Sequence, residues 1–199
     1  MTNKIRLFAL GLIALMAFGS VSVLAANYDI DAAHSAVTFQ VKHLTISKVS
    51  GSFGDVAGSF TFAEGESDSW QTEVTIQVSS VDTGNDKRDD HLRNEDFFNA
   101  EKFPTIVFKS TGVKMSSDTE GTLMGDLTMH GVTKPVELDM EYNGSVIDPW
   151  GNERAGFSLT GKIKRKDWGL TYNSVLESGG VMIGDDIKIS LEVEGIKAK

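Results

Sequence analysis

Hydrophobic and polar residues alternate along most of the chain with a period of two residues. The clearest run is Val136-Glu137-Leu138-Asp139-Met140-Glu141-Tyr142, in which apolar and acidic side chains take alternate places. Seven further runs show the same alternation: 36–42, 56–62, 74–78, 106–109, 123–129, 155–163 and 187–193. Successive side chains of a strand point to opposite faces, so each run predicts a strand with one buried and one solvated face. The pattern therefore predicts an all-β protein of eight antiparallel strands.

Segments rich in turn-forming residues separate most of these runs. They are Ala63-Glu64-Gly65, Asn143-Gly144, Asp148-Pro149-Trp150-Gly151 and Gly184-Asp185-Asp186. The segment Asn85–Phe103 interrupts the strands, and Arg88, His91, Leu92 and Glu95 fall in it at helical spacing. We interpret it as a short helical insertion that packs on the sheet as a lid.

Eight amphipathic antiparallel strands form either a sandwich or a closed barrel. Long, regular strands with open edges promote aggregation, which favours the barrel. The side chains expected to face inward carry no charge: Val37, Phe39, Val41, Phe60, Phe62, Val74, Ile76, Val78, Phe108, Leu127, Met129, Leu138, Met140, Phe157, Leu159, Ile189 and Leu191. From this pattern alone, the interior is either a solid core or a space for an apolar ligand, and both interpretations remain open.

The first 25 residues predict a secretory signal peptide. A short basic stretch, Met1–Arg6, precedes an apolar run, Leu7–Phe18, and small residues from Gly19 to Ala25 follow. The apolar run is shorter than the roughly 20 residues that span a bilayer, which disfavours an uncleaved anchor. We expect cleavage after Ala25 or Ala26, which leaves residues 26–199 as one exported domain without a stable membrane anchor.

Composition excludes several other classes of protein. The 199 residues include 19 Lys and Arg against 28 Asp and Glu, so the chain carries a formal net charge of −9. Such a charge argues against nucleic-acid partners and against electrostatic adhesion to membranes. The chain has no Cys, which excludes disulfides and thiolate chemistry. Three Trp and three Tyr, mostly outside the predicted strands, disfavour an outer-membrane barrel with aromatic girdles.

Known catalytic and metal-binding motifs are absent from the sequence. His34 and His43 are nine positions apart and would lie on opposite faces of one strand, so we expect no metal site. The stretch Gly156–Lys162 has the spacing of a phosphate-binding loop. Ile163 follows it where Ser or Thr is required, and the run alternates as a strand. We therefore predict no catalytic residues.

Several motifs spread over residues 26–199 resemble those of YceI-like proteins. The strongest block is Gly125-Asp126-Leu127-Thr128-Met129-His130-Gly131-Val132-Thr133-Lys134-Pro135-Val136. Others, in order, are Tyr28-Asp29-Ile30-Asp31, His34-Ser35, Arg88-Asp89-Asp90-His91-Leu92, Phe103-Pro104-Thr105, Asp148-Pro149-Trp150-Gly151 and Arg165-Lys166-Asp167-Trp168-Gly169. The resemblance implies a lipocalin-like, eight-stranded antiparallel barrel with a short helical insertion. It also implies a periplasmic protein that carries or sequesters a polyisoprenoid lipid, such as a polyprenyl quinone, polyprenol or prenyl phosphate. No other cofactor is implied, and a homodimer sharing one lipid tail is compatible with it.

Combined with the inward pattern, this resemblance gives a set of candidate ligand contacts. The lipid tail is expected to contact Val37, Phe39, Val41, Phe60, Phe62, Ile76, Phe97, Phe98, Phe108, Leu127, Met129, Leu138, Met140, Phe157, Leu159, Ile189 and Leu191. For a polar head group at the mouth, the candidates are Arg88, His91 and Arg165, with Trp168 beside them.

Two alternatives to these assignments stay open. Arg88 could instead form an exposed ion pair with Glu95 or Asp89, and Arg165 could do so with Asp167, each worth less than about 1 kcal/mol. The alternative function is an enzyme acting on a prenyl or acyl lipid, with His91 and Arg88 at the cavity mouth.

Overall fold

A computed structural model describes residues 25–175 and 179–199; residues 1–24, on which the predicted signal peptide falls, lie outside the described part. Within it, the strands are β1 (Ala26–Ile30), β2 (Ala36–His43), β3 (Ser47–Phe53), β4 (Val56–Phe62), β5 (Gln71–Gln77), β6 (Val81–Asp82), β7 (Thr105–Met115), β8 (Glu120–Met129), β9 (Val132–Ile147), β10 (Glu153–Lys164) and β11 (Ile183–Lys197). One α-helix, α1 (Asp86–Arg93), and three short 3₁₀ helices, η1 (Ser67–Ser69), η2 (Val78–Ser80) and η3 (Arg165–Trp168), complete the described elements.

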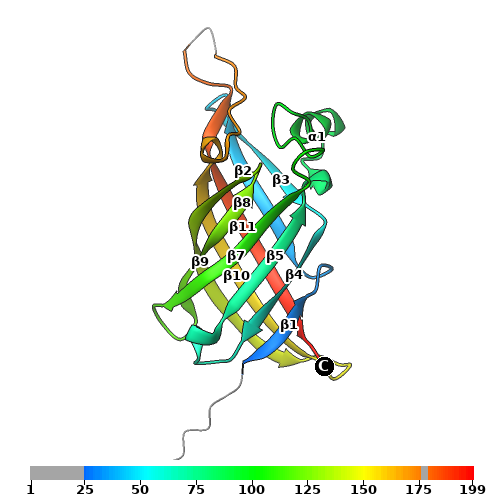
Figure 1. Cartoon of the computed structure of the whole chain (residues 1–199), viewed down its shortest axis with the longest axis vertical. Helices are drawn as coiled ribbons and strands as arrows, with labels where there is room; N and C mark the ends of the chain where they lie inside the picture. Colours follow the sequence, from blue (N-terminus) through cyan, green and yellow to red (C-terminus); the bar gives the residue numbers. More distant parts are fainter. Residues whose placement is uncertain (1–24, 176–178) are drawn as a thin grey trace, which may run out of the picture.

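Eight strands close into an antiparallel barrel. Their order around the barrel is β1-β4-β5-β7-β8-β9-β10-β11, and pairing of β11 with β1 completes the ring. Figure 1 shows these strands inclined to the long axis of the molecule, with α1 at one end and β1 at the other. These ends are called the α1 end and the β1 end below. The predicted all-β barrel with one short helix is confirmed.

The wall continues beyond the ring on the side of β11. The end of β11 pairs with β1, as in Ile30↔Gly195, and its beginning pairs with β2, as in Val41↔Ile187. Strand β3 pairs with β2, and β6 pairs with the end of β3. Strands β1 and β2 therefore share one edge of β11, and β2 and β3 form the wall near the α1 end.

The alternating pattern did not predict three of the strands. Strands β1 and β6 are only five and two residues long. Strand β3, Ser-Lys-Val-Ser-Gly-Ser-Phe, has Gly51 where an apolar residue would mark the inner face. A Cβ built at Gly51 would lie 2.5 Å from Cζ of Phe39, its partner on β2, so the Phe39 ring occupies that space. The predicted run 36–42 is a strand, but it belongs to this extension and not to the ring of eight.

Two of the predicted turns are irregularities inside strands. Asn143 and Gly144 lie in β9, where the register against β10 shifts between Gly156 and Phe157 and Gly144 has a φ of +110°. Gly184-Asp185-Asp186 lies in β11, where the register against β2 also shifts. Gly and Asp mark β-bulges as well as turns, so these two predictions were wrong. Asp148–Gly151 does connect β9 to β10.

Apolar side chains inside the barrel form two clusters. The cluster at the β1 end includes Tyr28, Phe62, Trp70, Tyr142 and Phe157. The other cluster includes Val37, Phe53, Ile106, Met129 and Trp168 and has Leu92 and Phe98 from the α1 region packed against it. Phe108 and Leu191 contact both clusters, so they lie at the middle of the barrel.

Candidate functional site

The interior of the barrel contains a cavity of about 230 Å³. Its polar lining residues are few: Thr38, Thr61, Gln71, Thr72 and Arg165. All other lining side chains are aliphatic or aromatic. One ordered water needs about 10–15 Å³ and several polar partners, whereas an apolar cavity of about 150 Å³ stays dry and accepts a small apolar guest. The cavity is therefore large enough for a guest and unfavourable for water.

The cavity is elongated along the barrel. Four alternate residues of β11 line it: Ile187, Ile189, Leu191 and Val193. At about 3.3 Å per residue, this stretch alone spans about 20 Å. Leu92 and Phe98 line the cavity near the α1 end, whereas Phe60 and Trp70 line it near the β1 end. The shape suits a long, narrow chain better than a compact molecule.

Several inward-facing residues keep part of their surface accessible. Phe39, Val41, Ile187 and Ile189 point to the interior, yet each is only half-buried, whereas Met129 on the opposite wall is buried. Side chains that border a void are not fully covered by neighbours. The interior is therefore not a solid core, which resolves the choice that the alternating pattern left open.

Most of the predicted tail contacts line this cavity. They are Val37, Phe39, Val41, Phe60, Ile76, Phe97, Phe98, Phe108, Leu127, Met129, Leu138, Met140, Phe157, Leu159, Ile189 and Leu191. Phe62 is the exception, because its ring packs against Trp70 and Tyr142, each with a centroid 4.8 Å away, in the aromatic cluster of the β1 end. The positions agree with the prediction, and contact with a ligand stays a prediction.

Further lining residues were not among the predicted contacts. They are Ile30, Phe53, Trp70, Val74, Leu92, Ile106, Val113, Leu123, Val136, Ile163, Leu170, Ile183, Ile187 and Val193, besides the polar residues named above. Leu92 could have been predicted as a lining residue, because it is the apolar residue at helical spacing in the insertion. Trp70 lies between η1 and β5, outside any alternating run, and only the packing of the barrel brings it to the cavity.

Arg165 borders the cavity, but its N–H groups bond to other groups of the protein. Its side chain is buried, and its Nε and Nη1 atoms donate to the carbonyl oxygens of Gly184 (3.0 Å), Leu170 (2.5 Å) and Tyr172 (2.9 Å). Its charged partner is Asp185, at 3.3 Å, and not Asp167. Burial lowers the pKa of the guanidinium, and the charge of Asp185 acts in the opposite direction. Arg165 thus ties η3 to the start of β11, and its contact with a head group stays a prediction.

The other head-group candidates do not line the cavity. Arg88 is exposed and donates from Nε to Thr83 Oγ1 (2.7 Å), not to Glu95 or Asp89. Trp168 is buried, and its Nε1 donates to the carbonyl oxygen of Leu127 (3.0 Å), so its indole N–H is already bonded; its place beside a head group stays a prediction. His91 hydrogen-bonds Asp96 through Nε2 (3.0 Å). Short-range sequence spacing could not show which way these side chains turn.

The region around α1 covers one end of the cavity. Asn85 caps α1 by accepting from the backbone N–H of Arg88, and buried Asp89 accepts from Thr83. Beyond the helix, Phe97 lines the cavity and lies 5.0 Å from the ring of Tyr172. The insertion therefore acts as the predicted lid, although only its first half is helical.

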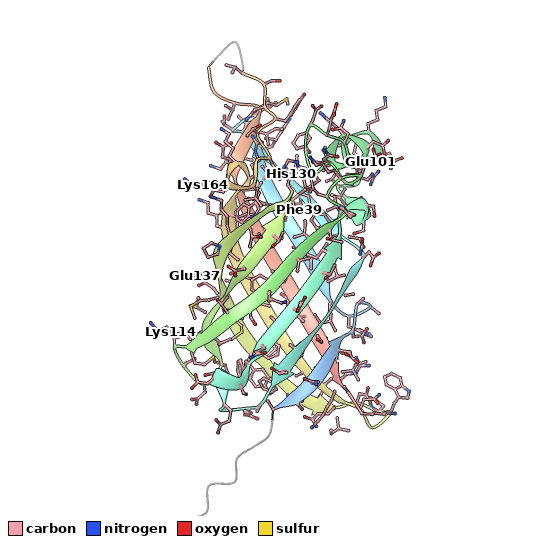
Figure 2. All side chains as sticks on the ribbon, in the orientation of Figure 1. Phe39, Glu101, Lys114, His130, Glu137 and Lys164 are labelled. Atoms are coloured by element: carbon pink, nitrogen blue, oxygen red, sulfur yellow. The ribbon has the colours of Figure 1, made fainter. Side chains whose placement is uncertain are left out.

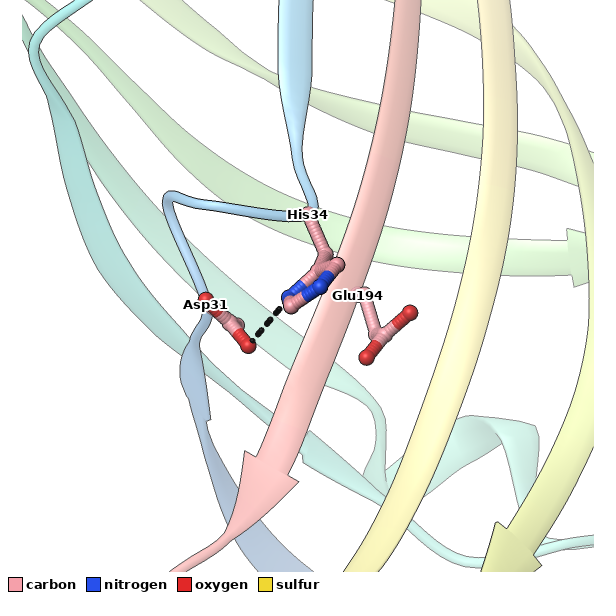
Figure 3. A group of neighbouring side chains, drawn as sticks. All are labelled: Asp31, His34 and Glu194. Carbon is pink, nitrogen blue, oxygen red and sulfur yellow. Dashed lines mark hydrogen bonds and ion pairs between the residues drawn. The ribbon is translucent and has the colours of Figure 1, made fainter. Parts of the chain in front are cut away.

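A network of charges around Arg154 joins β1, β10 and β11 near the β1 end. Arg154 donates to Asp148 (2.8 Å), to Asp31 (2.8 Å) and to Glu194. Asp31 also bonds His34 Nδ1 at 2.8 Å, as Figure 3 shows. The hydrogen bonds from Arg154 and His34 lower the pKa of Asp31 to about 2, and the bond from Arg154 lowers that of Asp148 further.

This network is also where metal-ligand atoms gather in the described residues. One nitrogen or oxygen atom from each of Asp31, His34 and Glu194 lies within 4.8 Å of the other two. The guanidinium of Arg154 bonds both Asp31 and Glu194, so each carboxylate already has a cationic partner. We therefore interpret the group as a structural ion-pair network.

Comparison with known proteins identifies the family. The model of the YceI-like domain matches residues 28–195. The chain belongs to the YceI-like family. It is 42% identical to a UPF0312 protein of Yersinia enterocolitica, over the whole length of both chains. A YceI protein of Campylobacter jejuni is 38% identical and superposes with a TM-score of 0.68, covering 79% of this chain and 90% of that one.

A more distant structure shares the fold of the YceI-like chain. It is a polyisoprenoid binding domain from Saccharophagus degradans, implicated in plant cell wall breakdown. The two chains are 17% identical and superpose with a TM-score of 0.62, over 86% of this chain and 98% of that one. In the described part of this chain, no helix has the length and apolar character needed to cross a bilayer.

Proposed function

We propose that this YceI-like protein binds one polyisoprenoid lipid inside its barrel and carries or sequesters it in the periplasm, without chemistry of its own. The observation that carries the proposal is the elongated apolar cavity, several of whose lining side chains are only half-buried. The distant structure named for polyisoprenoid binding supports the same ligand class for this barrel.

The cavity suits an isoprenoid chain on energetic grounds. Each CH₂ group transferred from water to an apolar surrounding contributes about 0.8 kcal/mol. Met129 and Met140 line the wall, and their flexible thioether side chains adapt to the methyl branches of a prenyl tail. A chain of several isoprene units therefore gains enough free energy to leave water, even without a polar contact.

The lining favours a lipid with an uncharged head group. Arg165 is the sole charged residue among the described residues that line the cavity, and its N–H groups donate to backbone carbonyls. Thr61, Gln71 and Thr72 are uncharged donors and acceptors near the β1 end. A polyprenol or a prenyl quinone fits this lining better than a prenyl phosphate, whose charge would need a cation.

Trp70 provides a direct test, because it lines the cavity and a bound quinone quenches nearby tryptophan fluorescence. Trp150 is 78% exposed and would dominate the background, so the titration uses the Trp150→Phe protein. We expect saturable quenching by a prenyl quinone at one equivalent, and competition by a polyprenol of equal chain length. A prenyl phosphate of that length should compete more weakly. Absence of saturable quenching, with no displacement by polyprenol, would overturn the proposal.

A further inference from the structure

A group of basic residues in this acidic chain lies together on one face near the α1 end. Five exposed lysines lie on the outer side of four adjacent strands: Lys42 (β2), Lys48 (β3), Lys162 and Lys164 (β10) and Lys188 (β11). They are called the lysine face below. Lys164 lies toward the α1 end in Figure 2, whereas Lys114 lies toward the β1 end.

The strand register places these lysines side by side. Lys42 is directly opposite Lys48, and Lys162 is directly opposite Lys188. Like charges in directly opposed positions destabilise a sheet, so the fold itself gains nothing from this arrangement. Asp186 bonds Lys162 at 2.7 Å and is the carboxylate in the middle of the face. Its pKa is lowered by that bond and by the charges of Lys162, Lys164 and Lys42, which shows that all three act on one spot.

Two exposed apolar side chains lie at the same end of the barrel. Ile46, at the tip between β2 and β3, is 85% exposed, and Val175 is 83% exposed. The backbone N–H of Leu44 donates to the carbonyl oxygen of Met182 (2.8 Å), so the β2–β3 tip contacts the segment that leads into β11. Leu44 and Thr45 have positive φ angles, and Thr45 is β-branched, so this turn is held in a strained form that presents Ile46 to solvent.

We propose that the lysine face and the apolar tips Ile46 and Val175 dock the α1 end of the barrel onto an anionic lipid bilayer. Lysines near an anionic membrane surface contribute about 1 kcal/mol each, and exposed apolar side chains beside them enter the headgroup region. An acidic protein partner would use the lysines but would not need Ile46 and Val175. The inference rests on the proposed function, since a lipid carrier must meet a membrane to load or unload its ligand.

The β1 end of the barrel also has exposed apolar side chains, but its charges differ from those of the lysine face. Val146, Ile147 and Trp150 are also exposed there, at 63%, 62% and 78%. Their neighbours are Asp148, on the same connection, and Glu153, at the start of β10. Asp148 bonds Arg154 and Glu153 bonds Lys197 (2.8 Å), so the basic side chains beside these apolar residues are paired with carboxylates.

The test is co-sedimentation of the purified full-length mature protein with vesicles that contain no isoprenoid. We expect binding to phosphatidylcholine vesicles that include phosphatidylglycerol, none to pure phosphatidylcholine, and loss of binding at high salt. The Lys42→Glu/Lys48→Glu protein should bind more than about tenfold more weakly, from two reversed charges. The matched control, Lys114→Glu/Lys199→Glu, has the same net charge and should bind as the parent does.

Four outcomes would overturn the inference, and the first three concern loss of binding. They are absence of binding to the anionic vesicles, equal loss in the two double variants, and loss with Trp150→Ser but not with Lys42→Glu/Lys48→Glu. Retention of full binding by Ile46→Ser/Val175→Ser would show that the face takes polyanions generally, which also overturns docking into a bilayer. Quenching of Trp70 by a prenyl quinone should be unchanged in Lys42→Glu/Lys48→Glu, so failure of docking is distinguishable from failure of ligand binding.

Discussion

The ring of Phe108 on β7 lies directly over Gly125 on β8. A Cβ built at Gly125 would come within 2.3 Å of Phe108 Cζ and 2.6 Å of its Cε2. Phe108 also lines the cavity and contacts both apolar clusters. Because Gly125 has no side chain, the Phe108 ring can lie against β8 instead of projecting further into the cavity.

Gly125→Ala should push the Phe108 ring toward the cavity. Overpacking of this kind costs typically about 1–3 kcal/mol, and the free energy of unfolding should fall by that amount. Affinity for a prenyl quinone should fall as well, because the ring takes space from the guest. Gly156→Ala is the control, since its Cβ would meet nothing closer than 3.7 Å. Equal effects of the two substitutions, measured by urea unfolding and by quenching of Trp70, would contradict this role of Phe108.

Leu191→Trp should fill the middle of the cavity. Leu191 lines the cavity, and the larger ring would occupy the space of the guest. We expect at least a tenfold loss of quinone affinity with a far-UV circular dichroism spectrum like that of the parent. Ser190→Trp places the same side chain on the adjacent, outward-facing position of β11 and should bind normally. If Leu191→Trp binds the quinone as tightly as Ser190→Trp does, the cavity is not the binding site.

Arg165→Met should destabilise the protein by about 2–4 kcal/mol, because several backbone carbonyls lose a charged donor in a buried place. Arg165→Lys should not restore stability, since one ammonium cannot reach the carbonyls of Leu170, Tyr172 and Gly184 together. Lys166→Ala, which removes only an exposed ion pair with Asp185, should change stability by less than about 1 kcal/mol. Urea unfolding compares the three proteins, and a near-neutral Arg165→Met would show that the carbonyls find other donors.

The Arg154 network predicts a dependence of stability on acid pH. The pKa of Asp31 is about 2 in the folded protein, against an ordinary 3.8, chiefly because Arg154 donates to it. The stability that this carboxylate contributes is present above pH 4, where the unfolded chain is ionised too, and is lost as pH falls toward 2. The free energy of unfolding should therefore fall between pH 4 and 2.

Arg154→Met should reduce that fall, because Asp31 and Asp148 then lose the partner that lowers their pKa. The variant should also be less stable at neutral pH. Lys114→Met, an exposed substitution outside the network, should keep the pH profile of the parent. Urea midpoints measured from pH 7 to pH 2 give the comparison, and identical slopes for Arg154→Met and the parent would refute the assignment.

Strand content and most of the cavity wall could be predicted from alternation alone. In β10, for example, every second residue from Ala155 to Ile163 turns inward, because the pleat of a strand fixes the side. Alternation cannot distinguish a filled barrel from an open one, since Phe39 facing a void and Phe62 in a packed cluster occupy equivalent places in the pattern. The void depends on how side chains from distant strands meet.

The polar part of the site was predicted less well, for a physical reason. An arginine reaches over several ångströms in many directions, so sequence neighbours such as Asp167 do not determine its partner. Arg165 instead donates to carbonyls of Leu170 and Gly184, groups that every residue carries and that leave no trace in the sequence. The net charge could not predict the lysine face either. A sum of −9 over the whole chain does not show where the lysines lie, and it is the register of β2, β3, β10 and β11 that brings them together.

The central claim is that the cavity holds an isoprenoid guest, and solvent extraction of the purified protein followed by mass spectrometry tests it most directly. The parent and the Ser190→Trp protein should each yield close to one equivalent of a prenyl lipid. Leu191→Trp, prepared in the same way, should yield almost none. An equal yield from all three proteins, or no prenyl lipid from the parent even after incubation with a prenyl quinone, would contradict the account.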